Sequence, residues 1–231
     1  MPAGFQTFNE TGNVQIDANF KNMEFRSKGT FSIAPTNAPN GGGVTSTYTV
    51  RFTGQAPILA IVCSSYCYVG TYIEGAETLF VIVNAENATI TGEYFIFDVA
   101  DNTQSSNSGL QVFNELGQLV FDANKRYMKV LDYYEAVGVT QVQTRSYGGK
   151  KIAWVMTDYG YTWSVLGPPN DPGSTTYRMI INMTDCATTS NSTMQVYRRT
   201  MYVNTRAPYR PEYQGKTEGP SRWLVLDVTN L

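Results

Sequence analysis

Short apolar runs recur along the whole chain, and Gly, Pro, Asn or Ser residues separate them. Alternating or β-branched runs of four to eight residues with such boundaries are typical of strands in antiparallel sheets. The residues from 125 to 137 can be read as a helix, but their alternating pattern favours a strand. The chain is therefore predicted to be all-β, with strands near residues 48–53, 58–63, 78–83, 89–91, 139–144, 152–157, 177–182 and 194–203.

Two β-hairpins are predicted where apolar residues flank a turn sequence. The first joins residues 5–8 to 14–17 through Asn9–Gly12, and the second joins residues 110–113 to 119–122 through Asn114–Gly117. An Asn side chain at the start of a turn bonds nearby backbone amides, and a Gly at its end adopts positive φ without strain. We expect a bulged hairpin in both places.

These two hairpins are copies of one another. Residues 4–23 and 109–128 match without a gap at an offset of 105, and ten of the twenty positions are identical. The ends also correspond, because residues 94–99 resemble residues 223–228. The duplication predicts two tandem antiparallel β-sandwich-like domains, residues 1–103 and 109–231, joined by a linker at 104–108.

The second copy is longer than the first. Asp17 and Asp98 are 81 positions apart, and Asp122 and Asp227 are 105 positions apart, a difference of 24. The Pro- and Gly-rich segments 166–174 and 206–220 are the places we expect for this extra length, because neither can form the interior of a strand. In the second segment, Tyr209, Arg210 and Tyr213 are candidate protein contacts, since Tyr and Arg are enriched at interfaces.

Composition and charge exclude several functions. The net charge is −2 without any basic run, so we expect no nucleic-acid partner, and no apolar run approaches the roughly 20 residues that span a bilayer. Three cysteines argue against a disulfide framework and favour buried free thiols, although a Cys63–Cys67 bridge stays open. The chain lacks histidine and any phosphate-binding glycine loop, so we expect no cofactor, no metal site and no enzyme activity.

The recurring aspartates allow two interpretations. A pair of carboxylates could act as in a glycosidase, but an Asp at a strand end commonly caps a turn, and we favour the cap. Tyr161 and Trp163 lie in an aromatic cluster that could contact a glycan, although cross-strand packing is the simpler interpretation.

The segment Gly109-Leu-Gln-Val-Phe-Asn-Glu-Leu-Gly-Gln-Leu-Val-Phe-Asp122, with its copy near the N-terminus, resembles the start of small tail proteins of siphophage-type tailed bacteriophages. The resemblance covers about twenty residues in each copy and brings no catalytic residues with it. It implies a virion structural protein of the tail tip, baseplate or tail fibre, made in the bacterial cytoplasm. Other tail proteins, copies of the chain itself and a host surface receptor are the implied partners. A capsid decoration protein and a glycan-binding receptor-recognition module are the alternatives.

Overall fold

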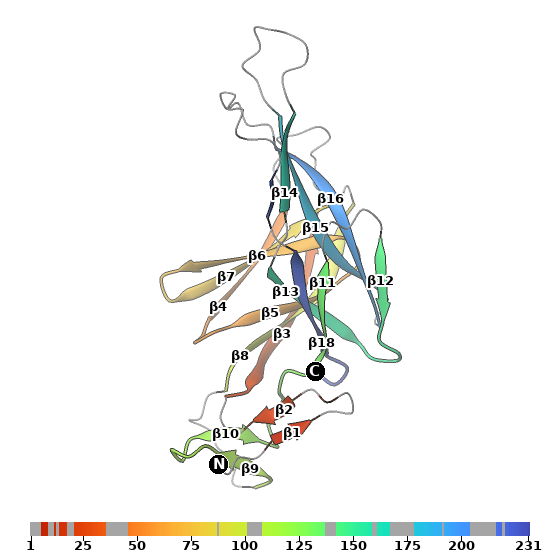
Figure 1. The fold of residues 1–231 in the computed structure, drawn as a ribbon. Helices are drawn as coiled ribbons and strands as arrows, with labels where there is room; N and C mark the ends of the chain where they lie inside the picture. Colours follow the sequence, from red (N-terminus) through yellow and green to blue (C-terminus); the bar gives the residue numbers. More distant parts are fainter. Residues whose placement is uncertain are drawn as a thin grey trace.

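The computed structural model describes residues 6–8, 12, 14–17, 21–35, 46–86, 88–100, 108–136, 142–158, 161–166, 178–190, 192–203, 216–218 and 220–231. These residues form strands and turns and contain no helix, which confirms the predicted all-β class (Figure 1). All strand pairs are antiparallel, as the sequence predicts.

Two large sheets form the body. A six-stranded sheet has the order β11-β18-β13-β5-β8-β3, and its strands are β3 (Met23–Ile33), β5 (Ile58–Cys63), β8 (Ile90–Val99), β11 (Val130–Ala136), β13 (Ile152–Asp158) and β18 (Ser221–Asp227). An eight-stranded sheet contains the path β12-β16-β15-β6-β7-β4, formed by β4 (Thr47–Thr53), β6 (Cys67–Glu74), β7 (Glu77–Asn84), β12 (Gln143–Ser146), β15 (Arg178–Ser190) and β16 (Thr193–Val203). The remaining two strands, β14 (Tyr161–Leu166) and β17 (Lys216–Glu218), pair beside β15.

In the six-stranded sheet, and along the six-strand path of the eight-stranded sheet, equivalent strands of the two copies lie at equal distances from the centre. Strands β3, β5 and β8 of the first copy correspond to β11, β13 and β18 of the second, and β4, β6 and β7 correspond to β12, β15 and β16. The copies meet at their equivalent strands, where Trp154 pairs with Ile61 and Cys186 pairs with Cys67. The duplication therefore generates an internal twofold arrangement.

This arrangement differs from two sandwiches that follow one another along the chain. The boundary at 104–108 separates the copies in sequence, but strands from both sides of it lie in the same sheets. The reason lies in strands such as Ile58–Cys63, which is apolar on both faces and buried along most of its length. A strand of this kind is stable in the middle of a sheet rather than at its edge. Pairing of β5 with β13 places both strands in the interior of the sheet.

The main hydrophobic cluster lies between the two sheets and contains side chains of both copies. Phe31, Ile61 and Ile82 of the first copy belong to it together with Trp154 and Val196 of the second. A second cluster covers the opposite face of the six-stranded sheet and includes Phe95, Phe97 and Leu226. One shared core therefore holds the repeats together.

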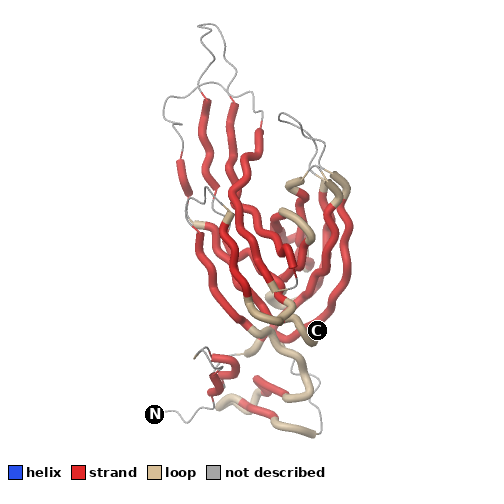
Figure 2. Tube along the Cα trace, turned by 90° about the vertical axis from the view of Figure 1, so that its right-hand side faces the viewer, coloured by secondary structure: helices blue, strands red, loops and turns tan. Residues whose placement is uncertain are grey.

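Backbone contacts also join β3 to the segment that precedes β11, at one end of the six-stranded sheet. The Phe25 amide donates to the Arg126 carbonyl at 2.7 Å, and the Met128 amide donates to the Met23 carbonyl at 2.8 Å. Met23 and Met128 are equivalent residues in the duplication, so this contact too lies on the internal twofold arrangement. Figures 1 and 2 show two small hairpins at this end, and Figure 1 shows β14, with which β17 pairs, towards the opposite end.

Candidate functional site

The two small hairpins, which we call the opener hairpins, consist of β1 (Gln6–Phe8) with β2 (Val14–Asp17) and β9 (Gln111–Phe113) with β10 (Leu119–Asp122). In the second hairpin the Asn114 side-chain oxygen accepts hydrogen bonds from the amides of Leu116 and Gln118. Gly12 and Gly117 have φ angles of 81° and 72°. Both pairs also contain a register shift. The predicted bulged hairpins are confirmed.

Apolar side chains at the opener hairpins are exposed to solvent. Phe8 is 58% exposed and its equivalent Phe113 is 50% exposed, so the fold does not need either ring as a core residue. Leu110 and Leu116 of the second hairpin are 56% and 81% exposed. The turn explains the identical Asn and Gly residues, but it does not explain the identical Phe. The sequence interpretation did not identify Phe8 and Phe113 as candidate contact residues. Their identity in both copies is the feature of the sequence that could have pointed to them.

The second opener hairpin is fixed to the body by specific polar contacts. The Asn22 side chain donates to the Val120 carbonyl at 2.9 Å, which connects the first copy to the second. The buried Asp122 donates its backbone amide to the Tyr127 hydroxyl at 2.8 Å. Burial raises the pKa of Tyr127, so its hydroxyl stays protonated well into the alkaline range. The exposed Phe113 is therefore presented on a firmly attached hairpin.

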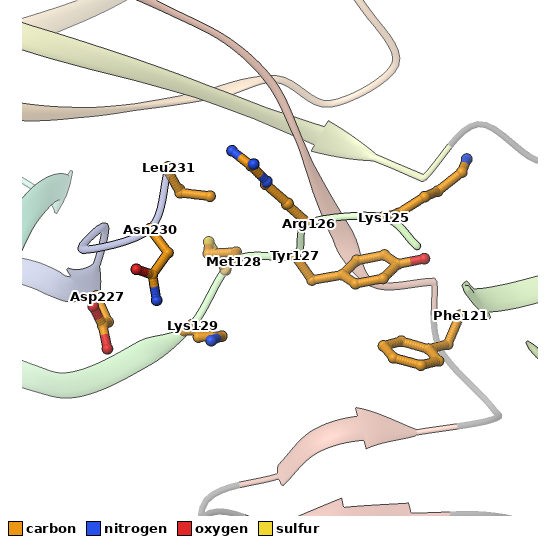
Figure 3. Close-up of a pocket in the computed structure, with 9 residues that line it drawn as sticks. All are labelled: Phe121, Lys125, Arg126, Tyr127, Met128, Lys129, Asp227, Asn230 and Leu231. Carbon is orange, nitrogen blue, oxygen red and sulfur yellow. The ribbon is translucent and has the colours of Figure 1, made fainter. Parts of the chain in front are cut away.

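A pocket of about 430 Å³ lies beside this hairpin (Figure 3). The Phe121 and Tyr127 rings stack with centroids 4.9 Å apart and form one wall. Lys125 is held by Glu24 at 3.1 Å, and Lys129 lies near enough to Asp227 to help lower the pKa of that carboxyl. The lining residues are Phe121, Lys125, Arg126, Tyr127, Met128, Lys129, Asp227, Asn230 and Leu231. Aromatic walls and excess positive charge could accommodate an acidic segment of a partner protein.

Two of the recurring aspartates, Asp98 and Asp227, accept hydrogen bonds from turn residues, as the cap interpretation predicts. The Asp98 carboxylate accepts the backbone amides of Gln55, Ala56 and Val99 at 2.8 to 3.0 Å. Asp227 accepts the amide and hydroxyl of Thr229. The described part of the chain contains no group of three acidic or Cys residues arranged to hold a metal ion.

Cys63 and Cys67 are buried thiols, as predicted, and they do not form a disulfide with each other. The hydrogen bond with the Cys67 side chain keeps the pKa of the Cys63 thiol below its ordinary value, although burial acts in the opposite direction. The two thiols lie on β5 and β6, the strands at which the copies meet. We read them as packing residues of this junction.

The strand that carries the two candidate glycan contacts, β14, lies towards the other end of the molecule (Figure 1). Tyr161 and Trp163 are on β14, where they pair in register with Met183 and Ile181 of β15. Tyr209, Arg210 and Tyr213 lie outside the described residues, so their role stays a prediction. Strands β14 and β17 have no counterpart among the described residues of the first copy. Together with Arg178–Met183 of β15 and Arg199–Val203 of β16 they form what we call the arm.

Comparisons of the chain with protein-family models, with curated proteins and with solved structures find no match. Within the described residues, no helix has the length and apolar character needed to cross a membrane.

Proposed function

We propose that this chain is a virion structural protein of a tailed bacteriophage, a component of the tail tip, baseplate or tail fibre. It acts by protein–protein assembly near the host-recognition apparatus. The observation that carries the proposal is the pair of exposed, equivalent rings, Phe8 and Phe113, on two hairpins at one end of the molecule. The resemblance of both hairpins to the start of siphophage tail proteins supports the same conclusion.

Burial of these rings supplies a physical basis for assembly. Covering a large apolar side chain contributes about 1.5–3 kcal/mol. Two equivalent rings on one molecule can engage two copies of a partner at once, and simultaneous engagement multiplies weak affinities. The opener hairpins are thus the end that attaches to neighbouring tail proteins, and the basic pocket beside Phe121 receives an acidic segment of the same neighbour.

The arm lies towards the end opposite the opener hairpins, and we assign to it the contact with a host receptor. Its strands β14 and β17 have no counterpart among the described residues of the first copy, so attachment through the repeated hairpins does not require it. A glycan-binding module is the second candidate function, because the arm carries Tyr161 and Trp163 on an added strand. A capsid decoration protein would use the same hairpins on a different part of the particle.

The proposal is tested by incorporation of variants into phage particles. The double variant Phe8→Ser with Phe113→Ser should enter particles at least about tenfold less than the unaltered protein, and each single variant should fall between them. Tyr72→Ser is the matched control, because Tyr72 is 61% exposed but lies on the β6–β7 hairpin of the body. Normal incorporation of the double variant would overturn the proposal.

Imaging of labelled particles separates the alternatives. Label on tails supports the proposal, whereas label on heads that lack tails indicates a decoration protein. Saturable binding to host polysaccharide that is lost in Tyr161→Ala or Trp163→Ala indicates the glycan-binding module. Hydrolysis of a host glycan by the purified protein would exclude a purely structural role.

A further inference from the structure

All three cysteines of the chain meet at the junction of the two copies. Cys63 ends β5 and Cys67 begins β6, so this pair lies where the chain passes from the six-stranded to the eight-stranded sheet. Cys186 is 119 positions further along the sequence, on β15 of the second copy, and it pairs in register with Cys67. The fold therefore brings cysteines of both copies to one place.

The strand register also gives the face of the sheet on which this pair lies. Residues directly opposite one another in an antiparallel pair share a face of the sheet. Cys186 is opposite Cys67 of β6 on one side and opposite Val196 of β16 on the other. Cys67 and Val196 are 0% and 2% exposed, and both belong to the main hydrophobic cluster. Position 186 thus lies between them in a row that faces the core.

The backbone separation of such a pair suits a disulfide. Opposite residues of an antiparallel pair have Cα atoms about 4.5–5.5 Å apart. Disulfides join Cα atoms that are about 4.4–6.8 Å apart. The register of Cys67 and Cys186 therefore allows a covalent bond without movement of either strand.

A bond at this place would strengthen the sparsest backbone pairing in the body. Among the described residues, the copies share one register pair in each sheet, Trp154 with Ile61 and Cys186 with Cys67. Within the first copy, by contrast, β6 and β7 pair along their whole length. Side-chain packing joins the copies in the main cluster, and a disulfide would add a covalent connection to it.

We propose that Cys67 and Cys186 form a disulfide that links the two copies when the chain meets an oxidising environment. The oxidant is a low-molecular-weight disulfide such as oxidised glutathione. The two cysteine thiols give it two electrons and two protons as their sulfur–sulfur bond forms, and its own sulfur–sulfur bond breaks to leave two small thiols. This covalent modification goes beyond the proposed function and does not depend on it.

Cys63 is the competing partner, because its side chain is hydrogen-bonded to that of Cys67. Loop length decides between the two bonds. A Cys63–Cys67 bond spans four positions, whereas a Cys67–Cys186 bond spans 119. Closing a longer loop removes more conformational freedom from the unfolded chain and stabilises the fold more. The bond between the copies is therefore the product expected at equilibrium, and Cys63 remains a thiol.

The first test identifies the bond. The full chain is refolded from denaturant in a buffer of reduced and oxidised glutathione, so that burial does not keep the oxidant from the thiols. Mass spectrometry of peptides prepared without reductant should find Cys67 joined to Cys186, with Cys63 alkylated. Cys63→Ala should retain this cross-linked peptide, and Cys67→Ala and Cys186→Ala should lose it. Three alkylated cysteines, or Cys63 in the main cross-linked product, would overturn the inference.

The second test measures what the bond does. Each refolded protein is unfolded in denaturant with and without dithiothreitol, so every variant is compared with itself and its own packing defect cancels. Reduction should raise the unfolding equilibrium constant roughly 30-fold or more in the unaltered chain and in Cys63→Ala. It should leave Cys67→Ala and Cys186→Ala unchanged. An unaltered chain that is equally stable with and without reductant would contradict a bond between the copies.

Discussion

The two copies of the repeat have equivalent strands but carry different side chains at equivalent core positions. Register places Trp154 and Trp223 of the second copy where the first has Leu59 and Tyr94. Both tryptophans are fully buried, and the Trp223 ring stacks on Tyr134 with centroids 5.4 Å apart. Met194 and Val196 of β16 belong to the same cluster. At these two positions the second copy has the larger side chains, whereas the buried Phe31, Phe80, Phe95 and Phe97 of the first copy lie at other positions of the shared strand arrangement.

The largest effect that tests this comparison is loss of a core tryptophan. Trp154→Ala should lower the free energy of unfolding by about 3–5 kcal/mol, and Leu59→Ala at the equivalent position should lower it by less, about 2–3 kcal/mol. Trp154→Phe should cost less than Trp154→Ala, because the indole nitrogen of Trp154 has no hydrogen-bond partner to lose. Denaturant unfolding, followed by circular dichroism, measures all three.

The same experiment reports how strongly the copies depend on each other. Because both contribute to one core and to both sheets, we expect a single cooperative transition in the unaltered chain. Two separate transitions, with Trp154→Ala moving only one of them, would instead indicate independent domains. A greater loss from Leu59→Ala than from Trp154→Ala would contradict the larger contribution to stability that we expect from the second copy at this position.

Local structure was predictable from sequence where the residues themselves dictate it. Asn114 and Gly117 specify their turn, and the alternation after residue 125 gives the strand β11. The strands Ile58–Cys63 and Leu119–Asp122 have the bounds that the pattern predicts.

The join between the copies was not predictable in the same way. It depends on which strands lie at the centre of a sheet, and the alternating pattern of one strand does not name its neighbour. The continuous apolar runs Ile58–Cys63 and Ile152–Val155 were the available signal, since they indicate strands buried on both faces. Strand β6 (Cys67–Glu74) was missed because its Ser, Tyr and Gly neighbours resemble a loop. Phe8 and Phe113 were not predicted to be exposed contact residues, because the turn requirement already explained the identical Asn and Gly residues next to them.

A smaller contrast concerns the equivalent aspartates at the ends of β8 and β18. Asp98 is buried and accepts three backbone amides, two of them from the loop that follows β4. Asp227 is partly exposed and bonds only within its own turn, apart from Lys150 at 3.8 Å. Asp98→Ala should cost about 3 kcal/mol, because it leaves buried amides without acceptors, and Asp227→Ala about 1 kcal/mol. Thermal unfolding at neutral pH measures both, and equal losses would mean that the two turns are equally important to the fold.

The smallest effect is the pH dependence that Asp227 confers. Burial raises the pKa of this carboxyl, but hydrogen bonds from Thr229 and the charges of Lys150 and Lys129 outweigh burial and lower it below the ordinary 3.8. A carboxyl whose pKa is lower in the folded chain stabilises the fold above its unfolded pKa, and the contribution is lost as the pH falls through the folded pKa. Stability of the unaltered chain should therefore decline more steeply below pH 3.8 than that of Asp227→Asn. Parallel acid profiles for the two proteins would show that Asp227 has the same pKa in the folded and unfolded chains, and that its bonds to Thr229 do not depend on charge.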